Sequence, residues 1–109
     1  MKWPRLGGLR HRLQIEAAER GTADGGGATL TWQPVATVWA EIAPISGREV
    51  VVADGLSARV THEVRLRYRA DLAPEMRFTS AGRVLDIRVV RDVDGRKRWL
   101  SCLCEETLP

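Results

Sequence analysis

The sequence predicts an all-β protein: a small antiparallel barrel or sandwich of six or seven strands, with one long loop between its second and third main strands. Apolar and polar residues alternate with a period of two along several segments, which is typical of half-buried strands. Glycine, proline and Asp-Gly separate these segments at short intervals. No segment shows the periodicity of a convincing amphipathic helix.

The composition indicates one domain over residues 1–109, with an N-terminal arm at 1–7 and a tail at 106–109. A chain of 109 residues, 44% of them hydrophobic, can bury one modest core. No apolar run approaches the roughly 20 residues of a membrane helix, and no signal peptide is recognisable. We therefore expect a protein made on the cytoplasmic side with no membrane contact. The net charge of +3 permits contact with DNA or an acidic protein without requiring it.

The first strand is expected around residues 9–16, where apolar and polar side chains alternate. A glycine-rich loop over residues 21–27 leads to a second strand that begins at Thr29. Pro34 marks a kink, bulge or edge position there, because proline cannot donate a ladder hydrogen bond. We expect this strand to end before Pro44.

The connection that follows, residues 45–58, is unusually long. Loops of about a dozen residues are uncommon in compact domains and are usually functional or disordered. Gly47 and Gly55 bracket it and could act as hinges. Three consecutive valines followed by Ala-Asp-Gly disfavour a helix and suit an extended or hairpin-like loop. Alternatively, the valines cover a barrel end or form another strand.

The third main strand, residues 59–69, alternates most cleanly. One face is expected to be core, and arginines dominate the other. The residues of the core face are Val60, His62, Val64, Leu66 and Tyr68. Shorter strands follow at 76–79, 83–93 and 96–105, and Asp94-Gly95 predicts a two-residue type I′ hairpin turn between the last two.

The register of this last hairpin follows from the two-residue turn. Val89 would face Leu100, and Ile87 would face Cys102. A slip by one residue would scatter the apolar residues over both faces of the sheet. The register therefore explains Cys102 and Cys104 as core residues rather than as zinc ligands, of which a site usually needs four.

The same register opposes Arg91 to Arg98, and opposed like charges destabilise a sheet. Either the hairpin tip extends past the core into solvent, or it docks on an acidic surface of another protein. The candidate docking residues are Arg91, Arg96, Lys97 and Arg98.

Catalytic motifs are not apparent. We recognise no phosphate-binding loop, dinucleotide fingerprint or nucleophile elbow, and we expect no cofactor, no metal and no enzymatic activity. The main alternative to a structural protein is a nucleic-acid-binding barrel. In such a barrel, Trp32, Trp39 and Trp99 would be platforms for stacked bases, and the arginines of the third main strand would contact phosphate. An unrecognised enzyme is a weaker third possibility.

Several short motifs occur in a fixed order over about residues 7–105. They are Gly8-Leu-Arg-His-Arg-Leu, Trp32-x-x-Val-Ala-Thr-Val-Trp-Ala-Glu-Ile-x-Pro44, Ser46-Gly-Arg-Glu49, Thr61-His-Glu-Val-Arg-Leu-Arg-Tyr-Arg69, Met76-Arg77, Arg83-Val-Leu-Asp-Ile87 and Trp99-Leu100. Their ordered combination resembles the tailed-phage head–tail joining family, also called head-closure or stopper proteins, which has relatives in gene transfer agents.

The resemblance implies a β-barrel in a homo-oligomeric ring, expected to be six-fold, within a virion or phage-like particle. The ring would lie below the portal and its adaptor protein, close the DNA channel and dock the tail through the tail terminator protein. Contact with packaged double-stranded DNA would be non-specific, and most arginines would face protein partners. The loop at 45–58 would project into the channel as a gate. Its candidate residues are Ser46, Gly47, Arg48, Glu49, Val50, Val51, Val52, Asp54 and Gly55.

Overall fold

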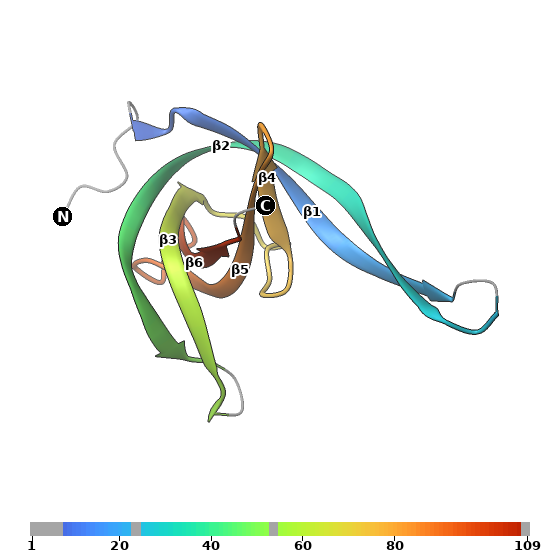
Figure 1. Cartoon of the computed structure of the whole chain (residues 1–109). Coiled ribbons are helices and arrows are strands. Elements are labelled where there is room, and N and C mark those ends of the chain that lie inside the picture. The colour runs from blue at the N-terminus through green and yellow to red at the C-terminus, as the bar shows by residue number, and fades with distance from the viewer. Residues whose placement is uncertain (1–7, 23–24, 53–54, 108–109) are drawn as a thin grey trace.

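In the computed structural model, six antiparallel strands form one sheet that closes into a barrel (Figure 1). The structure describes residues 8–22, 25–52 and 55–107. The strands are β1 His11–Thr22, β2 Ala28–Val51, β3 Ser57–Arg67, β4 Arg77–Ser80, β5 Arg83–Asp92 and β6 Trp99–Glu106. Their order is β1-β2-β3-β6-β5-β4, and β1 also pairs with β4. The all-β fold class is confirmed, and no helix of the described residues is long and apolar enough to cross a membrane.

The core fills the barrel with alternate side chains from the strands. Its buried members are Leu13, Ile15, Ala40, Val64, Leu66, Leu72, Phe78, Leu85, Ile87, Leu100, Cys102 and Cys104. The predicted core face of β3 is confirmed by Val60, Val64 and Leu66, which are at most 1% exposed. The two cysteines are buried and free, as predicted. Burial raises the pKa of the Cys102 thiol to about 12 and also raises that of Cys104.

Strand β2 determines the shape of the molecule. It has 24 residues, whereas a typical strand has about 5–6. Its middle is barrel wall, and both ends continue into long hairpins (Figure 1). Residues 28–33 pair with β1 alone, and residues 48–51 pair with β3 alone. Two hairpins therefore project from one continuous strand.

Two bulges interrupt β2, and each lies beside a proline. Glu16 pairs with Pro34 while Ile15 pairs with Ala36, so one residue of β2 has no partner, as the proline predicted. The prediction that the strand ends before Pro44 is wrong, because Pro44 pairs with His62. The ladder resumes at Arg48 after residues 45–47 bulge out.

The segment predicted as a long loop at 45–58 therefore has the extended, hairpin-like form, but with narrower boundaries. Pairing continues through Val51 and Ser57. The predicted tail also starts later, since Glu106 belongs to β6. The predicted N-terminal arm at 1–7 and Asp54 lie outside the described residues.

The predicted register of β5 and β6 is wrong. Val89 pairs with Leu103 rather than Leu100, and Arg91 pairs with Ser101 rather than with Arg98. The turn is a loop over residues 93–98, because the Asp92 carboxylate accepts hydrogen bonds from the backbone N–H of Gly95 (3.1 Å) and Lys97 (3.0 Å). A bulge between Ile87 and Val89 adds a further shift, and the predicted opposition of two arginines does not occur.

Candidate functional site

The two predicted sites lie at opposite ends of β3. The β2–β3 hairpin joins its first residue, Ser57, and the 93–98 loop lies beside its last residues, where the N–H of Tyr68 donates to the carbonyl of Arg98 (3.0 Å). Strand β3 has 11 residues, so at ~3.3 Å per residue its two ends are roughly 30 Å apart. The structure therefore keeps the hairpin and the 93–98 loop apart, whereas Arg91, which lies 3.9 Å from Glu63, is beside the middle of β3.

The β2–β3 hairpin has an inner and an outer face, because directly opposed residues of an antiparallel pair share a face. The inner pairs are Arg48 with Val60 and Val50 with Ala58, and the N–H of Val52 donates to the carbonyl of Leu56 (2.7 Å). The outer pairs are Glu49 with Arg59 and Val51 with Ser57. The valine triplet is therefore split: Val50 and Val52 are half-buried, whereas Val51 is 75% exposed.

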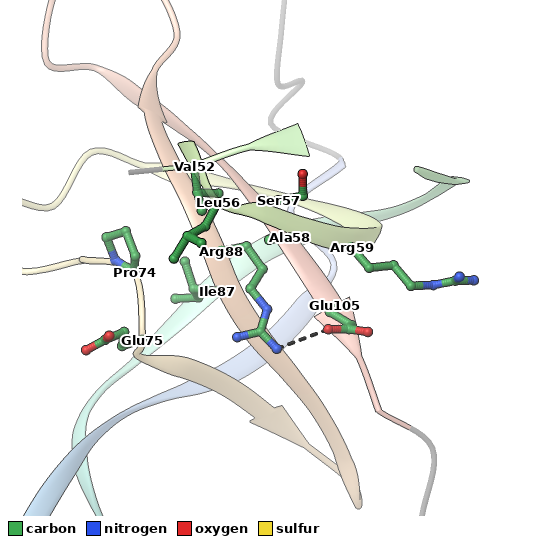
Figure 2. Close-up of a pocket in the computed structure, with 10 residues that line it drawn as sticks. All are labelled: Val52, Leu56, Ser57, Ala58, Arg59, Pro74, Glu75, Ile87, Arg88 and Glu105. Atoms are coloured by element: carbon green, nitrogen blue, oxygen red, sulfur yellow. Dashed lines mark hydrogen bonds and ion pairs between the residues drawn. The ribbon is translucent and has the colours of Figure 1, made fainter. Parts of the chain in front are cut away.

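The inner face borders an open pocket of about 530 Å³ (Figure 2). Val52, Leu56 and Ala58 form one wall, and Pro74 and Ile87 form the other. In the same view, the Arg88 guanidinium donates to the Glu105 carboxylate at 3.0 Å. The side chain of Leu56 remains 66% exposed. The pocket is thus a largely apolar hollow in which Arg88 and Glu105 pair with each other, which suits packing more than chemistry.

The four predicted docking residues do not form one free cationic patch. Arg98 pairs with Asp94 at 2.5 Å, and the hydrogen bond from Arg98 lowers the pKa of that carboxyl. Arg91 lies 3.9 Å from Glu63. Arg96 and Lys97 are exposed and make no ion pair with the described residues. The usable positive charge of this loop is therefore concentrated at its tip.

Arginine–carboxylate pairs cross the outer wall of the barrel. Arg77 pairs with Glu16 of β1 at 2.7 Å, Arg65 with Glu41 of β2 at 2.8 Å, and Arg83 with Glu106 of β6 at 2.6 Å. These partly exposed pairs join neighbouring strands. The expectation that most arginines face other proteins stays a prediction, although many of them are engaged within the chain.

Glu63 is the most connected carboxylate of this wall. The Ser101 hydroxyl donates a short hydrogen bond to it, and Arg65 donates two, at 3.1 and 2.8 Å. Burial alone would raise the pKa of Glu63, but these hydrogen bonds and the charges of Arg65 and Arg91 outweigh it, so that its pKa lies below the usual value. Glu63 is a structural group here, fully used in holding β3 against β6.

Two of the three candidate tryptophan platforms are covered by arginines of the same chain. The Arg77 guanidinium lies 4.0 Å from the centre of the Trp32 ring, and that of Arg67 lies 5.0 Å from the Trp99 ring. Only Trp39, at 57% exposure, presents a large open surface. Base stacking needs accessible rings, so this arrangement disfavours the nucleic-acid-binding alternative. Among the described residues, no group of His, Cys, Asp and Glu side chains could hold a metal ion.

The comparisons with known proteins decide the family. Residues 4–107 match the model of the family described as phage head completion protein. The chain belongs to this family. A chain of the solved "Virion of native gene transfer agent (GTA) particle" is similar at 31% identity, over 97% of this chain and 99% of that chain, with a TM-score of 0.68. The resemblance inferred from the ordered motifs is confirmed.

A second solved structure, protein SF1141 from Shigella flexneri 2a, is similar at 28% identity. The match covers 94% of this chain and 96% of that chain, with a TM-score of 0.67. No curated protein matches the chain significantly. As a member of this family, the chain is a structural component of a phage or gene-transfer-agent particle.

One surface, beside the β1–β2 hairpin, was not predicted from the sequence. A second hollow lies beneath the β1–β2 hairpin, next to Pro74 and Glu75. The strand that begins at Thr29 was predicted, but its pairing with β1 beyond the barrel was not. Nothing in the sequence marks Glu75, whose φ of 78° is in the region that favours glycine.

Proposed function

We propose that this protein is a head-closure, or stopper, component that forms a homo-oligomeric ring of six copies and has no catalytic activity. The ring lies between the portal's adaptor protein and the tail terminator protein, closes the DNA channel of the filled head and docks the tail. The full-length match to the phage head completion family carries the proposal. The separation of the two candidate surfaces to opposite ends of β3 supports it, because a connector must contact a different partner on each side.

The gate of this ring is the β2–β3 hairpin, residues 46–55. Beyond the bulge at 45–47, its described residues pair only between β2 and β3, and none of those described residues belongs to the main core cluster. It can therefore change position without opening the barrel. Val51 and Leu56 expose apolar surface that a free monomer leaves in water and that neighbouring copies can bury. Gly47 and Gly55 serve as hinges.

Docking to the tail side uses the 93–98 loop, with Arg96 and Lys97 as its free charges. Contact with packaged double-stranded DNA is non-specific. A strongly cationic lining would bind phosphate and retard DNA exit. The pairing of Arg65, Arg77 and Arg83 within the barrel wall limits that charge.

Electron microscopy of purified particles tests the ring, which should appear as one layer between portal and tail. Deletion of residues 48–55 should leave a folded barrel, and particles carrying it should lose packaged DNA, measured by nuclease sensitivity. Arg96→Ser with Lys97→Ser is the matched control, since it should retain DNA while reducing tail attachment. Absence of the layer, or full DNA retention after the deletion, contradicts the proposal.

A further inference from the structure

The hairpin of β1 and β2 projects from the barrel without support from a third strand. We define the β1–β2 arm as residues 17–22 paired with residues 28–33. Strand β1 pairs with β4 only through Gln14, Ile15 and Glu16, so the arm beyond them has two strands and two open edges (Figure 1). An isolated two-stranded hairpin is marginally stable in water. The arm therefore gains stability from any surface that covers it.

The base of the arm is nevertheless held in a fixed direction. Arg77 of β4 lies over the Trp32 ring at 4.0 Å and pairs with Glu16 at 2.7 Å. This stack orients the arm against the outer wall. It leaves a hollow of about 460 Å³ between them, which we call the arm groove.

The arm groove combines apolar surface with charged side chains, of which Arg88 pairs with Glu105 and Asp86 accepts a hydrogen bond from the Thr107 hydroxyl (3.5 Å). Ala18, Leu30 and Trp32 supply the apolar side, and Leu30 is 55% exposed. Arg20, Glu75 and Asp86 supply the charges. None of these three makes an ion pair with another described residue. The groove thus offers a binding surface for an aliphatic side chain flanked by both signs of charge.

The outer face of the β2–β3 hairpin has the matching features. It carries Val51, which is the most exposed large hydrophobic residue described, next to the opposed pair of Glu49 and Arg59. The Arg59 side chain borders the pocket of the hairpin and extends away from Glu75 (Figure 2). Within the described part of the chain, neither Glu49 nor Arg59 forms an ion pair.

One copy cannot join these two surfaces by itself. In one copy, neither Glu49 nor Val51 lines the pocket that the hairpin shares with Pro74 and Glu75. Contact between two different surfaces of identical copies is heterologous, and such contacts build closed rings when the rotation between copies closes. Charge complementarity and exposed apolar surface both indicate a second copy as the occupant.

We propose that the β1–β2 arm of one copy holds the outer face of the β2–β3 hairpin of the next copy. Val51 packs against Leu30, Glu49 meets Arg20, and Arg59 lies between Glu75 and Asp86. The proposal rests on the proposed function in assuming that copies form a ring. It adds that each gate hairpin is positioned by its neighbour, so that the hairpins move together.

A charge exchange tests the contact between Arg20 and Glu49. Arg20→Glu alone and Glu49→Arg alone each oppose two like charges, which should weaken association of the purified chain by about tenfold or more. The double variant restores opposite charges and should recover association, measured by analytical ultracentrifugation. Glu19→Arg is the matched control, because Glu19 lies on the other face of the arm. Equal losses in the control, or no recovery in the double variant, overturn the proposal.

Disulfide trapping gives an independent readout. When Leu30→Cys and Val51→Cys chains are mixed and oxidised, the expected product is the mixed dimer, while buried Cys102 and Cys104 do not react. A product linking two Val51→Cys chains instead would show hairpins meeting one another and would overturn the proposal. A ring seen by microscopy that is unaffected by Arg20→Glu would also overturn it, while leaving the stopper function standing. Unchanged melting temperatures confirm that these surface variants fold.

Discussion

Val51 and Val60 of the β2–β3 hairpin test which part of the hairpin is buried within the monomer. Val60 is 0% exposed, whereas Val51 is 75% exposed. Replacing each with alanine removes the same two methyl groups and changes β-propensity in the same direction, so the difference between the variants reports burial. At ~0.8 kcal/mol per buried carbon, Val60→Ala should cost ~1.6 kcal/mol from transfer alone and about 2–3 kcal/mol with the cavity included. Val51→Ala, with a quarter of its surface covered, should cost ~0.4 kcal/mol.

Thermal unfolding followed by circular dichroism measures both variants. For a domain of this size, 1 kcal/mol corresponds to about 4–5 °C, so Val60→Ala should lower Tm by roughly 10 °C and Val51→Ala by about 2 °C. Equal shifts would refute the reasoning, because they would mean that Val51 is covered within the monomer. The hairpin could then supply neither a free gate nor a surface for a second copy.

Three further predictions concern Glu63, the two buried cysteines and Arg77. Because the folded-state pKa of Glu63 is depressed below its usual 4.5, its stabilising effect is complete above that pH and is lost as pH falls through the lower folded value. Tm should therefore drop below about pH 4.5, and less steeply in Glu63→Gln. Cys102 and Cys104, with raised pKa values, should resist a thiol reagent in the folded chain and react fully in denaturant; reaction without unfolding would contradict their burial. Arg77→Ala removes a half-buried ion pair and the stack on Trp32, and should cost about 1–2 kcal/mol in urea unfolding; no change would show that the arm needs no such support.

Much of the barrel was predictable because it depends on local patterns. The alternation of Val60, Val64 and Leu66 with arginines identified the core face of β3 directly. Burial of the two cysteines followed from the same period of two, even though the register used to argue it was wrong. Alternation decides which face a residue occupies, and the error of two positions at Ile87, which pairs with Cys104 instead of Cys102, preserves that face.

The register of β5 and β6 and the length of β2 depend on interactions between residues that the alternation of polar and apolar residues does not reveal. Asp94-Gly95 favours a two-residue turn, but the Asp92 carboxylate instead bonds two backbone N–H groups farther along and stabilises a wider loop. Pro44 was read as the end of a strand, yet a bulge places it where no donor is needed. The arm groove was not predictable, because it joins residues from β1, β2 and β5 with the 74–76 segment.

The distribution of apolar surface on β2 argues that its two ends exist for assembly. The residues of β2 that pack in or against the core lie between Ala36 and Ile42. Beyond them, Leu30 and Val51 are mostly exposed, so ordering those segments costs about 1–2 kcal/mol per residue with little burial to offset it in a free monomer. The offset must come from surfaces outside the monomer. A chain that belongs to a particle-forming family and carries two such hairpins on one continuous strand is therefore built to be completed by its neighbours, and a variant that shortens either hairpin should lose assembly before it loses the barrel.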